Sequence, residues 1–132
     1  MFLFSEKSKK ILEEVRPELK LLAEKVIKIS PIDFALTSGL RTKEEQQKLY
    51  RDGKSKTLNS KHLTGQAIDF VPWHDGAARF DDINSCCIIA GLFIALAKES
   101  LDIQEARSGA LWSRSLVSEN EFLDVYHVEL IN

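Results

Sequence analysis

Two of the three histidines lie in segments that also carry an aspartate. His62 comes seven residues before Asp69, and His127 comes three residues after Asp124. Two imidazoles and one carboxylate give a tetrahedral zinc ion three protein ligands and leave a fourth position for water, which is the usual layout of a catalytic zinc site. We therefore expect His62, Asp69 and His127 to bind one zinc ion.

Asp124 and Arg41 are the residues expected to do chemistry beside that ion. A fourth protein ligand would close the water position, so Asp124 suits a general base that takes a proton from the attacking water and passes it to the leaving amine. Arg41 follows the turn at 37–40 and offers a fixed cation for the oxyanion of the attacked carbonyl. Its alternative is a surface salt bridge. His74 has no comparable support and is expected in a loop.

The elements that must position these residues follow from capping signals and apolar periodicity. Ser5 can cap a helix, and Thr42 with Glu45 makes a capping box. Residues 53–63 are polar and rich in turn formers, so they are expected to form an exposed loop. Pro72 is expected to close the strand before it. The patterns predict helices over 5–15, 17–29, 42–51 and 81–100, strands over 33–38, 67–71, 103–106 and 126–131, and irregular structure over 107–121.

Alternation along two of these strands decides which side chains share a face. In the earlier strand Ile68 and Phe70 face one way and Asp69 the other. An unpaired carboxylate among apolar neighbours is costly and favours a cation. In the final strand His127 and Glu129 share a face, so Glu129 is expected either to orient His127 or to remain solvated.

Length and composition indicate one globular domain over residues 1–132. The chain has 132 residues, of which 44% are hydrophobic and 29% charged, so it can bury a sizeable core. The order of elements predicts the α+β class, with a small antiparallel or mixed sheet covered by helices. A formal net charge of −2 gives no strong attraction to nucleic acid.

The longest apolar run, residues 86–97, has 12 residues, whereas a membrane-spanning helix needs about 20. We therefore expect a buried helix and no insertion into a membrane. The first residues lack the pattern of a signal peptide, so no secretion route is expected from them. Cys86 and Cys87 lie in the apolar run without metal-ligand spacing, and we expect both to be reduced core residues.

Three blocks of the sequence resemble the LAS zinc peptidases, which include D-alanyl-D-alanine carboxypeptidases and the L-alanyl-D-glutamate peptidases of phage endolysins. Residues 38–42 (SGLRT) with Gln46 look like the family's arginine segment, residues 60–69 (SKHLTGQAID) like its core, and residues 124–129 (DVYHVE) like its closing segment. Residues 107–112 (RSGALW) resemble the family's Arg-x-Gly-x-Asp-Trp segment, but Leu111 stands where an aspartate is common. The resemblance implies a hedgehog/DD-peptidase-like fold, with zinc on His62, Asp69 and His127, Asp124 as general base and acid, and Arg41 on the scissile carbonyl.

The function that this resemblance implies is cleavage of the peptide part of bacterial peptidoglycan. The short chain looks most like a phage-type L-alanyl-D-glutamate endopeptidase, a monomer that waits in the host cytoplasm until a holin admits it to the cell wall. Two alternatives stay open, a D-alanyl-D-alanine carboxypeptidase and a non-catalytic zinc-bearing wall-binding domain. Trp73, Trp112 and Tyr126 are expected either to line a peptide groove or to serve packing.

Overall fold

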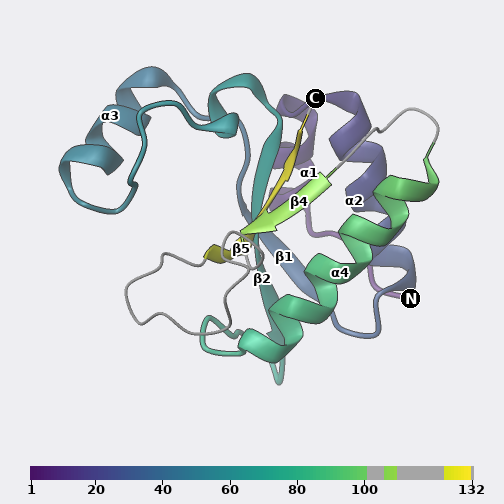
Figure 1. The fold of residues 1–132 in the computed structure, drawn as a ribbon. Helices are drawn as coiled ribbons and strands as arrows, with labels where there is room; N and C mark the ends of the chain where they lie inside the picture. The colour runs from purple at the N-terminus through teal and green to yellow at the C-terminus, as the bar shows by residue number, and fades with distance from the viewer. Residues whose placement is uncertain (101–105, 110–123, 132) are drawn as a thin grey trace, which may run out of the picture.

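An antiparallel sheet forms the centre of the molecule in the computed structural model, which describes residues 1–100, 106–109 and 124–131 (Figure 1). The strands lie in the spatial order β1 (Phe34–Ser38), β2 (Ala67–His74), β5 (Asp124–Leu130) and β4 (Ala106–Gly109), and the short β3 (Ala77–Ala78) pairs with the far end of β2. All of these pairings are antiparallel. The predicted α+β class is therefore confirmed, with an antiparallel sheet.

Helices cover one face of this sheet. α1 (Glu6–Glu14), α2 (Pro17–Ile29) and α4 (Ile83–Glu99) lie together on that face, whereas α3 (Lys43–Arg51) stands away from them (Figure 1). A short 3-10 helix, η1 (Lys61–Thr64), connects the loop after α3 to β2. In the described part of the chain, no helix is long and apolar enough to cross a membrane.

The helices begin at the polar residues that the sequence offers as caps. The Ser5 side chain accepts a hydrogen bond from the Ser8 amide, and the predicted capping box of Thr42 and Glu45 is present at the start of α3. Asp82 caps α4, so this helix begins at residue 83 and not at 81 as expected. Capping satisfies amide groups that the first helical turn leaves without partners.

The core lies between the helices and the sheet. Phe34, Phe70 and Phe93 are each at most 2% exposed, and their rings contact one another at centroid distances of 5.8 to 6.1 Å. Ile68 and Val128 are also fully buried in this cluster. Since alternate residues of a strand face opposite sides, the residue between Ile68 and Phe70 must face away from the helices. The predicted facing of β2 is thus confirmed.

β2 continues through Pro72 to residue 74, so the expected end at residue 71 is wrong. Trp73 donates its amide to the Asp33 carbonyl at 2.8 Å, toward β1. The nitrogen of Pro72 therefore points to the other edge, where β5 no longer pairs and where the Pro72 carbonyl accepts from the Arg79 amide at 2.8 Å. The pairing of β2 with β1 and with β5 therefore loses no hydrogen bond to the proline. His74 accordingly ends a strand and does not lie in a loop.

Three further expectations differ from the structure. Residues 107–109 belong to β4 and are not irregular, whereas residues 103–105 and 110–121 lie outside the described residues. The final strand begins at Asp124, two residues earlier than expected. Cys86 is buried as expected, but Cys87 is exposed on the outer face of α4, because adjacent helical residues point about 100° apart.

Candidate metal centre and cleft

The sheet brings Asp69 and His127 together directly. In the register of β2 with β5, Asp69 lies opposite His127, and in the register of β2 with β1 it lies opposite Ser38. Residues that are directly opposite in antiparallel strands share a face, with their Cβ atoms about 5 Å apart. Both side chains therefore project from the face that the helices leave open.

η1 supplies the third residue, His62. The Ser60 side chain caps η1 by accepting a hydrogen bond from the His62 amide at 3.2 Å. Gly65 ends it in the left-handed conformation, with φ of 70°, which a glycine adopts without steric cost. The Gly65 carbonyl then accepts from the Arg16 amide at 2.9 Å, which fixes this end of η1 to the junction of α1 and α2.

The ring of His62 is oriented by the backbone of Gly39. His62 Nδ1 lies 2.7 Å from the Gly39 carbonyl oxygen. Because a carbonyl only accepts, Nδ1 carries the proton and Nε2 presents its lone pair. Gly39 itself packs against α1, and a Cβ at this position would lie 2.7 Å from Ile11 Cγ2. A glycine is thus needed for the carbonyl to reach the ring.

The ring of His127 is oriented in the same way by Glu129. His127 Nε2 lies 2.9 Å from Glu129 Oε1, and both residues are buried. An ionised carboxylate only accepts, so Nε2 donates and Nδ1 is left to face Asp69. The structure supports the expectation that Glu129 orients His127. Its side chain is not solvated, since Glu129 is only 4% exposed.

The two lone pairs and the Asp69 carboxylate converge on one point. Asp69 Oδ2 lies 3.2 Å from His62 Nε2, and Asp69 Oδ1 lies 3.0 Å from His127 Nδ1. Three acceptors at these distances repel unless a proton or a metal ion lies among them. Ligand atoms around a tetrahedral zinc ion at about 2.0 Å lie about 3.3 Å apart. The donor set therefore fits a metal ion such as zinc, and His62, Asp69 and His127 form a group that could hold one.

The electrostatics of Asp69 agree with this arrangement. Burial alone raises the pKa of the Asp69 carboxyl. When protons and not a metal ion lie between the three groups, hydrogen bonds from His127 and His62, together with the charges of the two rings, outweigh burial and hold that pKa below its ordinary value. The carboxyl group is therefore ionised near neutral pH, as a metal ligand must be.

Arg41 lies beside the metal group and is held by two further side chains. Its Nη2 is 3.6 Å from Asp69 Oδ2. Its Nη1 donates to Gln46 Oε1 at 2.7 Å, and its Nη2 donates to Ser38 Oγ at 3.2 Å. Its amide also donates to the His62 carbonyl at 3.0 Å. The guanidinium is thus a fixed cation next to Asp69, and a purely surface salt bridge does not describe it.

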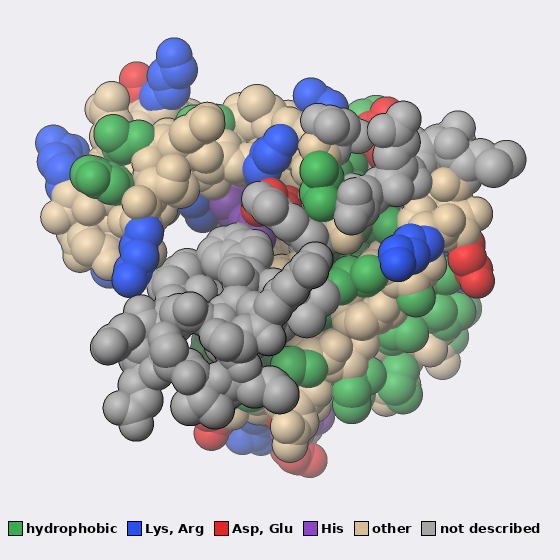
Figure 2. All heavy atoms as spheres, in the orientation of Figure 1, with side chains coloured by type: hydrophobic (Ala, Val, Ile, Leu, Met, Phe, Trp, Pro, Cys, Tyr) green, Lys and Arg blue, Asp and Glu red, His purple; other side chains and the backbone are tan. Residues whose placement is uncertain are grey.

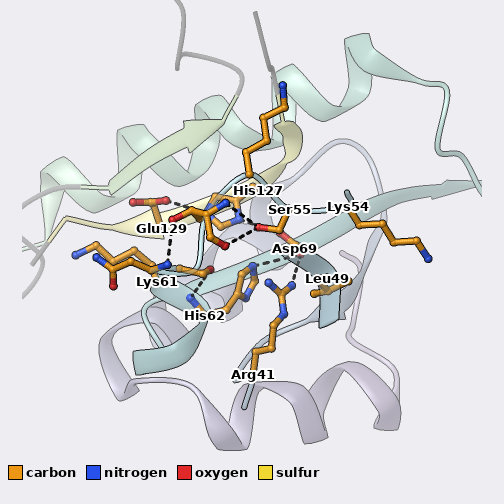
Figure 3. Close-up of a pocket in the computed structure, with 13 residues that line it drawn as sticks. Arg41, Leu49, Lys54, Ser55, Lys61, His62, Asp69, His127 and Glu129 are labelled. Atoms are coloured by element: carbon orange, nitrogen blue, oxygen red, sulfur yellow. Dashed lines mark hydrogen bonds and ion pairs between the residues drawn. The ribbon is translucent and has the colours of Figure 1, made fainter. Parts of the chain in front are cut away.

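These residues line one cleft of about 670 Å³. Figure 3 shows Arg41 and His62 directed toward Asp69, with His127 and Glu129 on the adjoining strand. The other side of the cleft is formed by Leu49 and by residues 54–57 and 59–61. A cleft of this size can admit a short peptide beside the metal group.

The remaining predicted site residues are placed as follows. Asp124 is the first residue of β5 and pairs with Gly109, but its side chain lies outside the described residues, as do Leu111 and Trp112. Trp73 and Tyr126 do not line this cleft. The hydrogen bond from Arg41 to Gln46 was not predicted, although the two residues are five apart and span the start of a helix.

Comparison with known proteins agrees with this geometry. A family model described as phage L-alanyl-D-glutamate peptidase matches residues 1–131. The L-alanyl-D-glutamate peptidase of Escherichia phage T5 is 34% identical over 137 aligned positions, covering 98% of each chain.

A solved structure shows the same fold. The crystal structure of the Serratia marcescens L-Ala D-Glu endopeptidase ChiX matches with a TM-score of 0.81 at 27% identity, covering 97% of this chain and 90% of that one. The resemblance that the three sequence blocks indicated is therefore confirmed. The chain belongs to the phage L-alanyl-D-glutamate peptidase family.

Proposed function

We propose that this protein is a zinc-dependent endopeptidase that cleaves the bond between L-alanine and D-glutamate in the peptide stem of bacterial peptidoglycan. The observation that carries the proposal is one carboxylate, Asp69, held between two histidine rings at the side of an open cleft. Relatives that match nearly the whole chain are named for this activity. His62, Asp69 and His127 are the proposed zinc ligands.

A bound zinc ion supplies a Lewis acid that polarises a carbonyl and makes water acidic enough to attack near neutral pH. The protein's own residues do the rest. Arg41 binds the oxygen of the scissile carbonyl, because its guanidinium is fixed beside Asp69 and needs no reorganisation as negative charge develops.

Asp124 is the proposed general base and acid. It begins the strand that carries His127, three residues away, so both come from one rigid element. An unligated carboxylate there takes a proton from the attacking water and returns it to the leaving amine. The protein acts as a monomer on the cell wall, after a holin-type release from the cytoplasm in which it is made.

The deciding experiment digests purified Gram-negative peptidoglycan with the zinc-loaded protein, beside a chelator-treated sample, and identifies new amino and carboxyl ends by mass spectrometry. Peptides that begin with D-glutamate are the expected product, and they should be absent from the chelated sample. Loss of terminal D-alanine would instead assign a carboxypeptidase. A digest without any chelator-sensitive product would favour a wall-binding domain.

The variant Asp124→Asn separates metal binding from turnover. It should keep bound zinc, because Asp124 is not a proposed ligand, and lose about 10²- to 10⁴-fold in kcat, the usual contribution of a general acid or base. Zinc content by mass spectrometry and peptide hydrolysis by chromatography give the two readings. Activity close to that of the unaltered protein would remove Asp124 from the mechanism.

A further inference from the structure

Gln46 is the one buried residue of α3, a helix whose residues are all described, and it is only 1% exposed. The helix stands away from α1, α2 and α4 (Figure 1). Figure 2 shows a hollow beside the α3 side of the molecule, with a histidine side chain visible in it. A surface helix usually buries an apolar stripe. A helix that instead buries one polar side chain calls for a role other than apolar packing.

The Gln46 amide connects Arg41 to the segment that forms another side of the cleft. Its Oε1 accepts from Arg41 Nη1 at 2.7 Å. Its Nε2 donates to Ser55 Oγ at 2.9 Å and to the Thr57 carbonyl at 2.7 Å, so both amide hydrogens are used. Arg41, Ser55 and Thr57 all line the cleft. One side chain therefore joins the guanidinium beside the metal group to the cleft wall.

The partners of Gln46 fix which end of its amide faces which side. A guanidinium only donates, so Arg41 requires the amide oxygen, and a backbone carbonyl only accepts, so Thr57 requires the amide nitrogen. A carboxylate at this position could not donate to Thr57. An ammonium group could not accept from Arg41, and an apolar side chain could do neither. A side-chain amide meets both requirements.

The hydrogen bond from Arg41 to Gln46 also keeps the guanidinium apart from Asp69. Arg41 Nη2 lies 3.6 Å from Asp69 Oδ2, which is longer than a hydrogen bond, and it donates to Ser38 Oγ at 3.2 Å. Without Gln46, the guanidinium could close on Asp69 or turn toward solvent. Either movement would take it away from the oxygen of the scissile carbonyl, and a misplacement of about 1 Å can cost about 10²-fold in rate.

Gln46 acts through Arg41, because its own side chain is buried and does not line the cleft. Resting on the proposed function and on the part of Arg41 in it, we propose that Gln46 is a positioning residue. Its amide oxygen directs the Arg41 guanidinium at the scissile carbonyl. Its amide nitrogen anchors that arrangement to the cleft wall at Ser55 and Thr57.

The test is a double-mutant cycle on the zinc-loaded full chain, with a synthetic stem peptide that contains the bond between L-alanine and D-glutamate. Arg41→Ala should lose about 10²- to 10³-fold in kcat, as is usual when an oxyanion donor is removed. Gln46→Met keeps the chain length without the amide, and it should lose roughly tenfold in kcat with unchanged zinc content. In a chain that already carries Arg41→Ala, Gln46→Met should change kcat by less than about twofold.

Gln46→Glu separates the two halves of the amide. The carboxylate still accepts from Arg41, but it cannot donate to Ser55 or Thr57. Its kcat should therefore stay close to that of the unaltered protein, and any loss should lie in KM. The segment keeps a further attachment, since the amides of Lys54 and Ser55 donate to the Leu49 carbonyl at 2.9 and 3.1 Å. This variant decides the question even where Gln46→Met does not fold.

The matched control is Gln47→Met, which makes the same substitution at the exposed neighbour on α3. Gln47 does not line the cleft, so kcat, KM and zinc content should all be those of the unaltered protein. A loss of kcat in Gln47→Met as large as that in Gln46→Met would show that α3 tolerates no such change, and the positioning role of Gln46 would be overturned.

The outcomes separate this inference from the proposed function. An unaltered protein that does not cleave the peptide would overturn the proposed function, and an undiminished kcat in Arg41→Ala would remove Arg41 from it. A slow Arg41→Ala beside a fast Gln46→Met would overturn the positioning role alone. An equal tenfold loss from Gln46→Met with and without Arg41 would also overturn it, as would a Gln46→Glu variant as slow as Gln46→Met, because the rate would then not depend on how Arg41 is held.

Discussion

The two ends of β2 bring histidine and aspartate side chains together in opposite arrangements. At one end a single carboxylate, that of Asp69, lies between the rings of His62 and His127. At the other end a single ring, that of His74, lies between the carboxylates of Asp75 and Asp82, at 2.9 and 2.8 Å. The same residue types therefore meet on one strand with the opposite stoichiometry.

The difference decides which cation each end of β2 is suited to hold. Two rings that share a carboxylate direct two lone pairs at one point, which suits a metal ion, and His62 and His127 are only 2% and 5% exposed. Two carboxylates on opposite sides of one ring direct nothing at a common point. They instead favour a proton on each ring nitrogen, and the hydrogen bonds to Asp75 and then to Asp82 raise the pKa of His74.

The largest expected contrast is between His62→Ala and His74→Ala. Loss of His62 should lower zinc affinity by more than about 100-fold and abolish hydrolysis, since even a residue that only supports a ligand contributes about 10- to 100-fold. Loss of His74 should leave both unchanged. Zinc per chain after gel filtration and hydrolysis of a stem peptide give the readings. Equal zinc in the two variants would contradict the assignment of metal to one end of β2.

Glu129→Gln tests the orientation of His127 without removing a ligand. The amide can donate to His127 Nε2, which would favour the wrong tautomer, so zinc affinity should fall by about 10- to 100-fold. Competition with a chromogenic chelator measures this. Glu13→Gln on the exposed side of α1 is the matched control and should bind zinc normally. Unchanged affinity in Glu129→Gln would mean that other contacts fix the ring.

Gly39→Ala tests how Gly39, whose carbonyl orients the ring of His62, packs against α1. The added Cβ would lie 2.7 Å from Ile11 Cγ2, and such overpacking should cost about 1–3 kcal/mol of unfolding free energy in urea. The control is Gly91→Ala, where a Cβ meets nothing within 4 Å in α4 and should be neutral or stabilising by up to about 1 kcal/mol. Equal stability of the two variants would show that α1 shifts to accommodate the new methyl group without loss of stability.

Local patterns were enough to predict much of the metal end of the molecule. The helix over 17–29, the capping box of Thr42 and the facing of Asp69 all follow from interactions within a few residues. The grouping of His62 with Asp69 and His127 came from residue type and spacing, aided by the resemblance of three blocks to a family of peptidases.

Contacts between residues far apart in the sequence could not be predicted from local patterns. His127 meets Asp69 across 58 residues of sequence, and only the register of the sheet makes them opposite. The extension of β2 through Pro72 depends on its pairing with β1 on one edge and with β3 on the other. The close approach of Gly39 to Ile11, and the hydrogen bond from Gln46 to Ser55, likewise depend on how separate segments pack.

The far end of β2 had a signal in the sequence, the Asp75-Gly76 dipeptide, from which the hairpin could have been predicted. Asp75 and Gly76 both have positive φ, of 54° and 76°, which is typical of a two-residue hairpin turn. That turn places His74 beside Asp82, the cap of α4. The contact between this hairpin and the start of α4 therefore depends on pH. We expect pH to change the free energy of unfolding through this contact, and not the binding of metal.

The sign of this pH effect follows from the two shifts. His74 has a pKa raised above 6.5, so its contribution is complete below about pH 6.5 and is lost as pH rises through the raised value. Asp82 has its pKa lowered from 3.8 to about 2, through Ser85 first and then His74, so its contribution is present above 3.8 and is lost as pH falls toward about 2. The contact is therefore strongest between these limits.

The smallest expected effect is a change in the stability difference between the unaltered protein and His74→Gln. Urea unfolding of the metal-free proteins should show the unaltered protein more stable at about pH 5.5 and the difference reduced at about pH 9. Taking the difference cancels the pH-dependent contributions that both proteins share. A difference that grows as pH rises would mean that His74 is held neutral, and the contrast between a metal-binding end and a proton-binding end of β2 would then fail.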